Sequence, residues 1–446
     1  MVIDYFFCGI GGSGMSALAR VLVAKGFAVA GSDRSFDQGK NLHISEALKS
    51  LGIQLYPQDG SGINKTTQIV VVSSAVEPSI PDIGKAVKLE ISIRKRSEIL
   101  NEILNMHNNR ICVGGTSGKS TVTAMIGWIL FFNQKNPTIL NGAGMTNFEC
   151  SNAICGAQEW AIAEVDESDK SIIIYSPTVA VINNISLDHM PINELIEVFQ
   201  EFADHSPHLI KNANCELSAK IKSDKESVFD SKQIEIIQMN LGGSKFIYDG
   251  TLFHLCQPGL HNIENALTAV VAAQQAGLST QQCASALAKY EGIARRFQFH
   301  LNTTSIKVID DFAHNPDKIE ALVKTMNLSK IPTTFIFQLH GFGPARTLKD
   351  EIIAVVAKNL RIKDHWIMPE IFYAGGTATK DISAKDYIDA LQEKDIKTSF
   401  LETRDDILRY ISENKKAEQN YVVLGARDPS LPAFADQIAQ LVKQKS

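Results

Sequence analysis

One loop in the first half of the chain has the residue types that bind a nucleotide's phosphate groups. Residues 115–121 read G-T-S-G-K-S-T, between a strand-like run and a helix-like run. In such a P-loop, backbone N–H groups surround the phosphates, a lysine neutralises the β- and γ-phosphate oxygens, and a hydroxyl binds Mg²⁺. The strict pattern has glycine where this chain has Val113, so the residues predict a variant P-loop. An ordinary glycine turn before a helix is the alternative. The predicted phosphate-binding residues are Gly115, Thr116, Ser117, Gly118, Lys119, Ser120 and Thr121.

A second glycine-rich turn lies near the N-terminus. Gly9, Gly11 and Gly14 match G-x-G-x-x-G after a strand-like run, and Asp33 follows the next such run. Glycines let the chain turn sharply and let backbone N–H groups approach a phosphate at a helix N-terminus. In dinucleotide enzymes an acid in that place holds the ribose hydroxyls. Alone, the pattern fits a nicotinamide cofactor, another nucleotide diphosphate or a tight turn without a ligand.

The two turns together reduce the number of functions that fit the sequence. An NAD-dependent oxidoreductase needs only the first turn and leaves the P-loop unexplained. An enzyme that uses ATP to modify a nucleotide-linked substrate needs both. The pair therefore favours ATP-driven chemistry.

The elements that position these turns alternate between strand and helix along most of the chain. Runs such as IDYFFC and RICVGG read as buried strands, and Lys119 to Phe132 reads as a helix. This alternation predicts an α/β protein with parallel sheets covered by helices on both faces. We expect three domains, at residues 1–107, 108–293 and 294–446. Residues 224–249 have the weakest pattern and are expected to form a loop or a hairpin.

Composition excludes several classes of protein. The chain has 446 residues, with 44 basic and 49 acidic side chains, so its formal charge of −5 gives no electrostatic signature of nucleic-acid binding. No apolar run approaches the ~20 residues of a membrane-spanning helix. The seven cysteines are scattered and odd in number. We therefore expect reduced thiols in a cytoplasmic protein.

Nine short motifs, read in order, resemble those of the Mur ligases of peptidoglycan synthesis, and most resemble the alanine-adding branch. They are GIGGSGMSALA…GSD, VVVSSAV, RKRSEIL, GTSGKST, AEVDESD, NNISLDHM, GLHNIENAL, RRFQ and DDFAHNP. The resemblance covers nearly the whole chain. It implies a Rossmann-like UDP-binding domain, a central P-loop ATPase-type parallel sheet and a Rossmann-like C-terminal domain that closes on the second.

The resemblance implies that the first turn holds the diphosphate of a UDP-muramoyl substrate and not NAD. The residues implied for that substrate are Gly11, Gly12, Ser13, Met15, Ser32, Asp33, Ser73, Ser74 and Arg96. The family transfers the γ-phosphoryl group of ATP to the muramoyl carboxylate, and an amine then attacks the acyl phosphate. The implied partners are UDP-N-acetylmuramate and L-alanine or a short peptide, acting with a monomer or homodimer, without nucleic acid or membrane.

Magnesium and ATP residues are also implied by the resemblance. Glu164, Ser120 and His189 correspond to magnesium ligands, and a carboxylate oxygen suits that hard cation. Asn141 resembles a polar position near the γ-phosphate. A solvated acidic loop is the alternative for the neighbouring acids, which are Asp166, Glu167 and Asp169.

The remaining predicted residues lie in the last part of the second domain and in the third domain. His261, Asn262 and Asn265 begin a helix and are assigned to adenine, although Asn262 also suits a helix cap. The resemblance assigns the remaining roles. Arg296 reaches the ATP phosphates, Asp311 contacts the ATP ribose or the hinge, and His314 lies by the amine. The predicted catalytic set is Lys119, Glu164, His189, Arg296 and His314.

Several positions depart from the alanine-adding pattern and leave the amine open. Ser117 stands where that branch has histidine, and D-D-F-A-H-N-P replaces D-D-Y-G-H-H-P, a form typical of the ligase that recycles a ready-made tripeptide. The run QLHGFGPARTL replaces Q-P-H-R-Y-x-R-T, keeping His340 and Arg346. Ligation of a murein tripeptide is therefore the alternative, and a catalytically altered paralogue and an oxidoreductase are the hypotheses of other classes.

Overall fold

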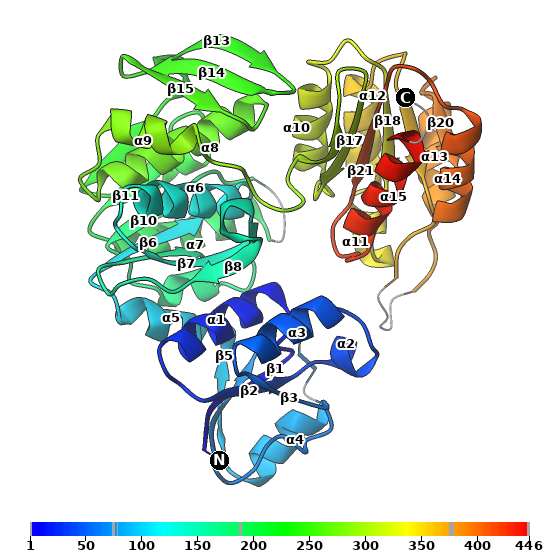
Figure 1. The fold of residues 1–446 in the computed structure, drawn as a ribbon. Helices are drawn as coiled ribbons and strands as arrows, with labels where there is room; N and C mark the ends of the chain where they lie inside the picture. Colours follow the sequence, from blue (N-terminus) through cyan, green and yellow to red (C-terminus); the bar gives the residue numbers. More distant parts are fainter. Residues whose placement is uncertain (1, 74–75, 78, 187–189, 374–378, 444–446) are drawn as a thin grey trace. The chain divides into compact units, whose positions relative to one another are not determined.

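The computed structural model describes residues 2–73, 76–77, 79–186, 190–373 and 379–443. They form two compact units. The first comprises residues 1–235, 246–255 and 264–293, and the second comprises residues 236–245, 256–263 and 294–446. Figure 1 shows the ribbon. Within the described residues, no helix has the length and apolar character needed to cross a membrane.

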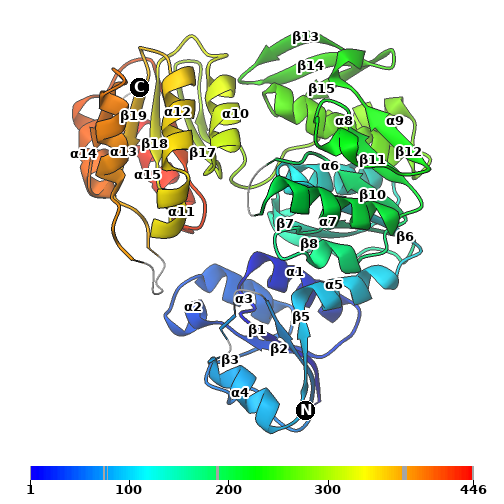
Figure 2. The same cartoon turned by 180° about the vertical axis from the view of Figure 1, so that it is seen from behind.

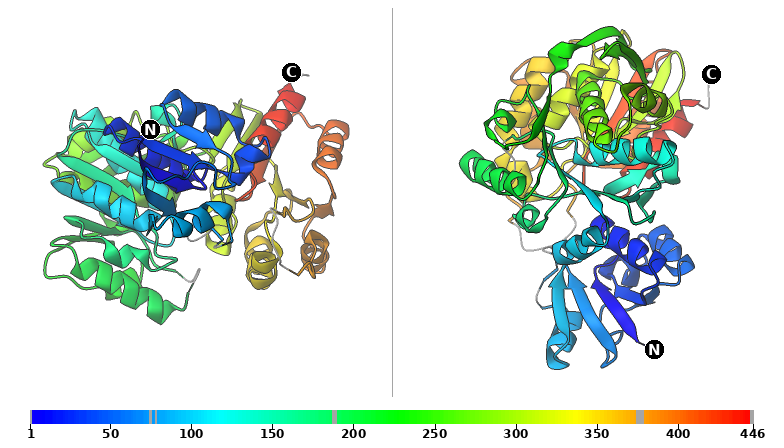
Figure 3. Two further views of the ribbon diagram at one scale, coloured as in Figure 1. Left: turned by 90° about the horizontal axis from the view of Figure 1, so that it is seen from below. Right: turned by 90° about the vertical axis from the view of Figure 1, so that its left-hand side faces the viewer.

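The N-terminal sheet has five parallel strands in the order β3-β2-β1-β4-β5. Its elements are β1 (Ile3–Cys8), α1 (Ser13–Ala24), β2 (Val29–Ser32), α2 (Arg34–Asp37), α3 (Leu42–Ser50), β3 (Gln54–Tyr56), β4 (Thr67–Val72), α4 (Pro81–Lys88), β5 (Ser92–Lys95) and α5 (Arg96–Asn105). Alternate residues of β1 face opposite sides, as strand geometry requires. Phe7 packs with the residues of α1 and α5, whereas Phe6 packs with Ala86 of α4. Figure 1 and Figure 3 show these helices covering the sheet.

The middle sheet has the order β12-β11-β10-β6-β9-β7-β8. Only the β7–β8 pair is antiparallel among its described pairings. Its strands and helices are β6 (Asn109–Gly114), α6 (Lys119–Phe132), β7 (Thr138–Met145), β8 (Ser151–Ile154), β9 (Trp160–Glu164), β10 (Val179–Ile182), α7 (Ile192–Asp204), β11 (Leu209–Asn212), β12 (Glu226–Phe229), α8 (Leu260–Gln274) and α9 (Thr280–Leu287). Short 3₁₀ turns cover Thr146–Phe148, Ser171–Ile174, Ser218–Lys220 and Ser231–Gln233. The central strands are buried on both faces, as is usual for parallel sheets.

Residues 224–249 contain two neighbouring strands joined by a two-residue turn, which agrees with the hairpin alternative, and a third strand extends them into a separate sheet. It comprises β13 (Ile234–Asn240), β14 (Gly243–Tyr248) and β15 (Thr251–Leu255), and β12 of the same region joins the middle sheet. β13 has mostly exposed side chains, so it lacks the apolar alternation by which a strand is recognised.

The C-terminal sheet has six strands in the order β16-β17-β21-β18-β19-β20, with β16 antiparallel to β17 and the rest parallel. Its elements are β16 (Gln298–Asn302), β17 (Ile306–Asp311), α10 (Pro316–Met326), β18 (Thr333–Phe337), α11 (Phe342–Thr347), α12 (Lys349–Asn359), β19 (His365–Met368), α13 (Ala384–Gln392), β20 (Thr398–Phe400), α14 (Arg404–Glu413), β21 (Gln419–Leu424) and α15 (Leu431–Lys443). Phe335 and Phe337 pack toward α10, α12 and α13, whereas Ile336 packs toward α14 and α15. Figure 2 shows this sheet from behind.

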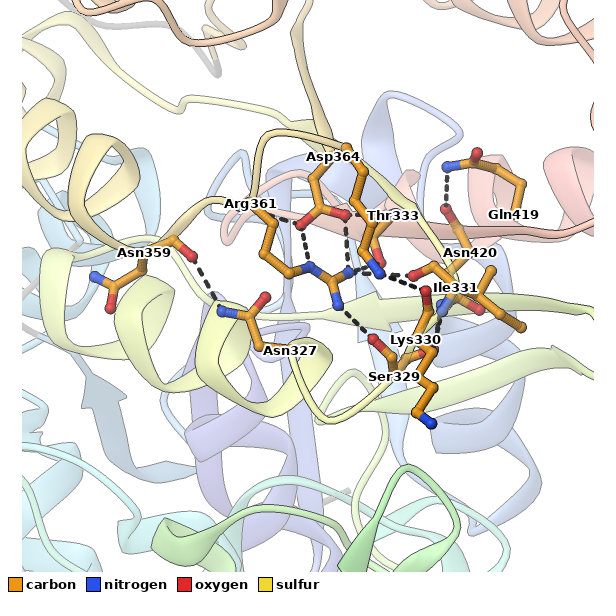
Figure 4. Close-up of polar contacts among 11 residues, drawn as sticks. Asn327, Ser329, Lys330, Ile331, Thr333, Asn359, Arg361, Asp364, Gln419 and Asn420 are labelled. Carbon is orange, nitrogen blue, oxygen red and sulfur yellow. Dashed lines mark hydrogen bonds and ion pairs between the residues drawn. The ribbon is translucent and has the colours of Figure 1, made fainter.

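A polar network lies at the end of this sheet where β18 and β19 begin (Figure 4). Arg361 donates to both carboxylate oxygens of Asp364, at 2.7 and 2.8 Å, and to backbone carbonyls of the loop before β18. Asp364 is fully buried and also accepts the N–H of Thr333 at 2.8 Å. The network therefore fixes the starts of two adjacent strands.

Candidate active site

The P-loop connects β6 to α6 and depends on two glycines with unusual backbone angles. Gly115 has φ of +132° and Gly118 has φ of +82°, both in the region that disfavours side chains. A Cβ at Gly118 would lie 2.5 Å from the Asn183 side-chain nitrogen and 2.6 Å from the Asn265 side-chain oxygen. The loop is therefore closely packed against neighbouring amides, and glycine is required.

The segment that follows β10 holds the P-loop in shape. The Asn184 side chain accepts the Ser117 N–H at 2.8 Å and donates to the Ser117 carbonyl at 2.9 Å. Asn183 donates to the same carbonyl at 3.1 Å, and the Ser186 N–H donates to the Thr116 hydroxyl at 3.0 Å. Neither Asn183 nor Asn184 is among the residues predicted for the site. Two consecutive amides at the end of an apolar strand were the signal available.

Lys119 is the first residue of α6 and forms an ion pair. Its Nζ lies 2.7 Å from Oε2 of Glu167, and the Glu167 side chain is only 2 % exposed. Burial alone would lower the pKa of Lys119, but the carboxylates of Glu167 and Asp166 outweigh it and raise that pKa. Burial also raises the pKa of Glu167, against the attraction of Lys119. The lysine therefore carries its charge at neutral pH, next to the loop that would receive phosphates.

Glu164 ends β9 and lies beside the P-loop serine. Its Oε2 accepts the Ser120 hydroxyl at 2.7 Å and the Gly142 N–H at 2.8 Å. A Cβ at Gly142 would lie 2.5 Å from the same oxygen, so the carboxylate position depends on a glycine there. The Asn141 side-chain nitrogen and the Ser117 hydroxyl are buried without hydrogen-bond partners among the described residues.

These groups meet the chemical needs of a magnesium ion on a phosphate chain. The Glu164 carboxylate and the Ser120 hydroxyl both offer oxygen ligands to a metal ion. They lie within hydrogen-bonding distance of each other, beside the charged Lys119. No group of three His, Cys, Asp or Glu side chains able to hold a metal occurs in the part of the chain that the structure describes. His189, the third predicted ligand, lies outside the described residues.

The residues predicted for adenine have differing surroundings. Asn265 is buried, and its side-chain oxygen accepts the Asn183 amide at 2.9 Å. Asn262 donates to the Pro258 carbonyl at 2.8 Å, which is a local contact that fixes the start of α8. His261 is exposed in the first turn of α8.

The N-terminal turn is held by Asp33. One oxygen of this carboxylate accepts the Gly11 N–H at 2.8 Å, and the other accepts the N–H and hydroxyl of Ser35 at 2.8 and 2.6 Å. A Cβ at Gly11 would lie 2.8 Å from the Asp33 oxygen. The Asp33 carboxylate therefore holds the turn in shape. The oxidoreductase interpretation requires the same carboxylate to bind the ribose hydroxyls of a dinucleotide.

Other predicted residues of this turn are also placed by the structure. The buried Ser32 hydroxyl donates to Asp82, which also accepts the Gly60 N–H at 2.7 Å. Arg96 lies against the start of α1, because a Cβ at Gly14 would come within 3.1 Å of its guanidinium.

The other residues predicted to bind the UDP-linked substrate have differing surroundings. The Ser13 carbonyl accepts the Asn152 amide at 2.6 Å, Met15 is buried, and the Ser73 carbonyl accepts the Val76 N–H at 3.1 Å. Gly12 donates its N–H to the Gly9 carbonyl at 3.2 Å, whereas Ser74 lies outside the described residues.

In the second unit, the predicted residues gather near the end of β17. The Arg296 guanidinium lies 4.7 Å from the centre of the Phe312 ring. Asp311 accepts the N–H groups of Phe297 and Ala313, each at 2.8 Å, so its carboxylate joins the start of β16 to the loop after β17. The Nδ1 atom of His314 lies 2.8 Å from the Phe312 carbonyl oxygen.

Comparison with known proteins gives a consistent result along the chain. Three family models match: "Mur ligase family, catalytic domain" over residues 4–108, "Mur ligase middle domain" over 113–273, and "Mur ligase, glutamate ligase domain" over 295–427. A protein of Fusobacterium nucleatum subsp. nucleatum named UDP-N-acetylmuramate–L-alanine ligase is 30% identical, covering 98% of this chain and 96% of its own. One of the same name from Dictyoglomus turgidum is 32% identical, covering 87% and 86%.

Solved structures have the same fold. The UDP-N-acetylmuramate-alanine ligase of Thermotoga maritima matches over 100% of both chains with a TM-score of 0.83 and 23% identity. A murein peptide ligase of Psychrobacter arcticus matches over 100% of this chain and 99% of its own, with a TM-score of 0.69 and 20% identity. The three matched family models, together with these relatives over nearly the full length, show that the chain belongs to the Mur ligase family.

Proposed function

We propose that this Mur ligase joins the carboxylate of UDP-N-acetylmuramate to the amino group of L-alanine, with hydrolysis of ATP to ADP and phosphate, in peptidoglycan precursor synthesis. The observation that carries the proposal is the placement of Lys119, Ser120 and Glu164 around one P-loop, in a chain with a second, separate glycine turn. The names of the relatives that match over most of the chain support the choice of substrates.

The chemistry begins with a poor electrophile. A carboxylate resists attack because negative charge is delocalised over its carbon and oxygens, so the proposed reaction first transfers the γ-phosphoryl group to it. This step brings two anions together and needs positive charge at the transferring group. Lys119 would exchange Glu167 for the β- and γ-phosphate oxygens when ATP binds. Backbone N–H groups of residues 115–121 would bind the remaining phosphate oxygens.

Glu164 and Ser120 are the residues we assign to magnesium, with His189 as a further proposed ligand. When bound, the ion supplies additional positive charge at the phosphate oxygens. Asn141 offers an N–H₂ group without a partner among the described residues, which suits an additional phosphate oxygen. The Thr116 hydroxyl accepts the Ser186 N–H at 3.0 Å, a contact that joins the P-loop to the segment after β10.

The amine then attacks the acyl phosphate and phosphate leaves. We assign Arg296 to the ATP phosphates and His314 to the amine, in a third domain that closes on the second. Burial lowers the pKa of His314 to about 3, so this imidazole is neutral at physiological pH. A group with so low a pKa is a weak base, and His314 suits the role of a hydrogen-bond acceptor that orients the amine.

The N-terminal domain is assigned to the uridine diphosphate group of the acceptor. The residues proposed for it are Gly11, Gly12, Ser13, Met15, Ser32, Asp33, Ser73, Ser74 and Arg96. The proposed location is cytoplasmic. A monomer or homodimer is proposed.

Ligation of a murein tripeptide is the second candidate, favoured by the D-D-F-A-H-N-P form of residues 310–316. Phosphate release by the purified protein with ATP, Mg²⁺ and UDP-N-acetylmuramate tests both candidates when L-alanine and the tripeptide are added in turn. We expect release that depends on L-alanine. Release with the tripeptide alone would establish the second candidate, and no amine-dependent release would contradict the ligase proposal.

A further inference from the structure

Three neighbouring strand ends of the C-terminal sheet bring one arginine and two histidines to the same edge. β21 pairs in parallel with β17 on one side and with β18 on the other, so the loops that follow these strands are adjacent. His314 comes from the loop after β17, His340 from the loop after β18 and Arg427 from the loop after β21. All three belong to the second unit.

The two histidines form a neutral polar pair. Their rings meet edge to face with centroids 5.4 Å apart. Burial, and to a smaller extent the positive charge of Arg427, lower the pKa of His340 to about 4. The Nδ1 of His314 faces the Phe312 carbonyl and so carries the proton, leaving its Nε2 as an acceptor.

Arg427 differs from the other arginines that contact its loop. Arg295 donates to the carbonyls of Gly425 and Ala426, at 2.7 and 3.2 Å. Arg404 binds Asp428 and donates to the Ser430 hydroxyl at 2.6 Å. These contacts hold the loop on both sides of Arg427.

The guanidinium of Arg427 is exposed and has no hydrogen bond or ion pair with any residue that the structure describes. Gly425, with φ of +150°, has no room for a Cβ, which would lie 2.6 Å from the Gln338 carbonyl oxygen. The loop therefore has a fixed backbone and presents one unpaired cation.

Among the residues that the structure describes, Arg427 is the cation whose charge acts on the His340 imidazole. The next residue is Gly341, with φ of +70°, where the family pattern given above has arginine. Arg346 lies further along and pairs with Asp381. A planar guanidinium binds a carboxylate through two parallel hydrogen bonds, and an adjacent neutral imidazole accepts one from an ammonium or amine.

We propose that Arg427 binds the carboxylate of the amine substrate while His314 and His340 lie beside its amino group, which makes Arg427 the residue that selects an α-amino acid over a simple amine. This inference rests on the proposed ligase function. It makes the loop after β21 part of the amine site.

The test compares wild type with Arg427→Ala and Arg427→Lys in the phosphate-release assay. The amine that supports wild-type turnover is supplied either with its carboxylate or as the corresponding carboxamide. We expect Arg427→Ala to raise the KM for the carboxylate form about 10- to 100-fold, with partial recovery in Arg427→Lys. The preference for carboxylate over carboxamide seen in wild type should disappear in Arg427→Ala. The KM values for both nucleotides should change by less than about twofold.

Arg409→Ala is the matched control, because this arginine is exposed on α14 and pairs only with Asp406 among the described residues. An unchanged KM for the amine in Arg427→Ala would overturn the inference. A rise in the KM for ATP alone would also overturn it, because the arginine would then bind a phosphate group. Failure of the proposed function is separately visible, because wild type itself would then release no amine-dependent phosphate.

Discussion

The two glycine-rich turns differ in how their acids are used. In the N-terminal turn, Asp33 accepts the N–H of Gly11 and two groups of Ser35, so its carboxylate stabilises the turn itself. In the P-loop, Glu167 pairs with Lys119 and Glu164 accepts the Ser120 hydroxyl, so the acids contact the groups assigned to phosphate and metal.

The N-terminal turn is therefore a preformed site, whereas Lys119 of the P-loop must exchange Glu167 for phosphate when a nucleotide binds. In the N-terminal turn, both oxygens of the Asp33 carboxylate already accept hydrogen bonds from the turn itself. The P-loop has a buried ion pair and a buried Ser117 hydroxyl without a partner in the described residues, and the Asn141 side-chain nitrogen of β7 is buried without one as well. Unpartnered buried groups cost free energy, and a bound nucleotide would relieve that cost.

The largest effect is expected from Lys119→Ala. Removing the charge leaves Glu167 buried without its partner and removes the cation assigned to the transferring phosphoryl group. We expect turnover to fall on the order of 1,000-fold, measured as phosphate release. Lys289→Ala, at an exposed position in the same domain, should retain wild-type turnover. Turnover in Lys119→Ala within a few-fold of wild type would show that the P-loop lysine is not needed.

Glu164→Gln should have the next largest effect. The amide keeps the shape of the side chain but removes the charge expected to bind magnesium. We expect turnover to fall on the order of 100-fold at limiting Mg²⁺, with partial recovery as Mg²⁺ is raised, and EDTA should abolish the activity of wild type. Glu216→Gln, an exposed acid of the same domain, serves as the control. A loss that Mg²⁺ does not relieve would argue against a metal role.

The substitution Asp33→Ala should affect the N-terminal turn and leave the P-loop unchanged. It removes the acceptor for the Gly11 N–H and for two groups of Ser35, so the turn should lose its fixed shape. We expect the KM for UDP-N-acetylmuramate to rise about 10-fold while the KM for ATP is unchanged. Asp33→Asn retains one acceptor oxygen and should show a smaller rise. Equal changes in both KM values would contradict the separation of the two turns.

Arg361→Met should affect stability and leave activity unchanged. Its ion pair with Asp364 lies in the network at the starting ends of β18 and β19, within the unit that contains neither glycine-rich turn (Figure 4). Breaking a buried pair leaves a charge without its partner, so we expect a loss of about 3 kcal/mol in unfolding free energy, measured by denaturant titration. Altered KM values in this variant would show that the network also supports the site.

Fold class and many elements could be predicted because apolar periodicity is local. The helix expected at 119–132 matches α6, and the three-domain α/β architecture is confirmed. The strands of residues 224–249 could not be predicted in detail, because β13 has exposed side chains on both faces.

The contacts of the site were less predictable than its residue types. The P-loop pattern predicted Lys119, and the resemblance implied Glu164. The Asn184 contacts with Ser117 depend on which loops are adjacent in the sheet, and spacing along the chain does not give that. The same is true of Asp33, whose role in shaping the turn emerges only from its contacts with Gly11 and Ser35. The assignments of the remaining site residues stay predictions.

Titration calorimetry with wild type and Lys119→Ala tests the central claim most directly. A non-hydrolysable ATP analogue with Mg²⁺ and UDP-N-acetylmuramate would each be titrated alone and then in the presence of the other. We predict that wild type binds both at once and that Lys119→Ala loses affinity for the ATP analogue only. Mutual exclusion of the two ligands, or equal loss of both in the variant, would contradict two independent phosphate-binding turns.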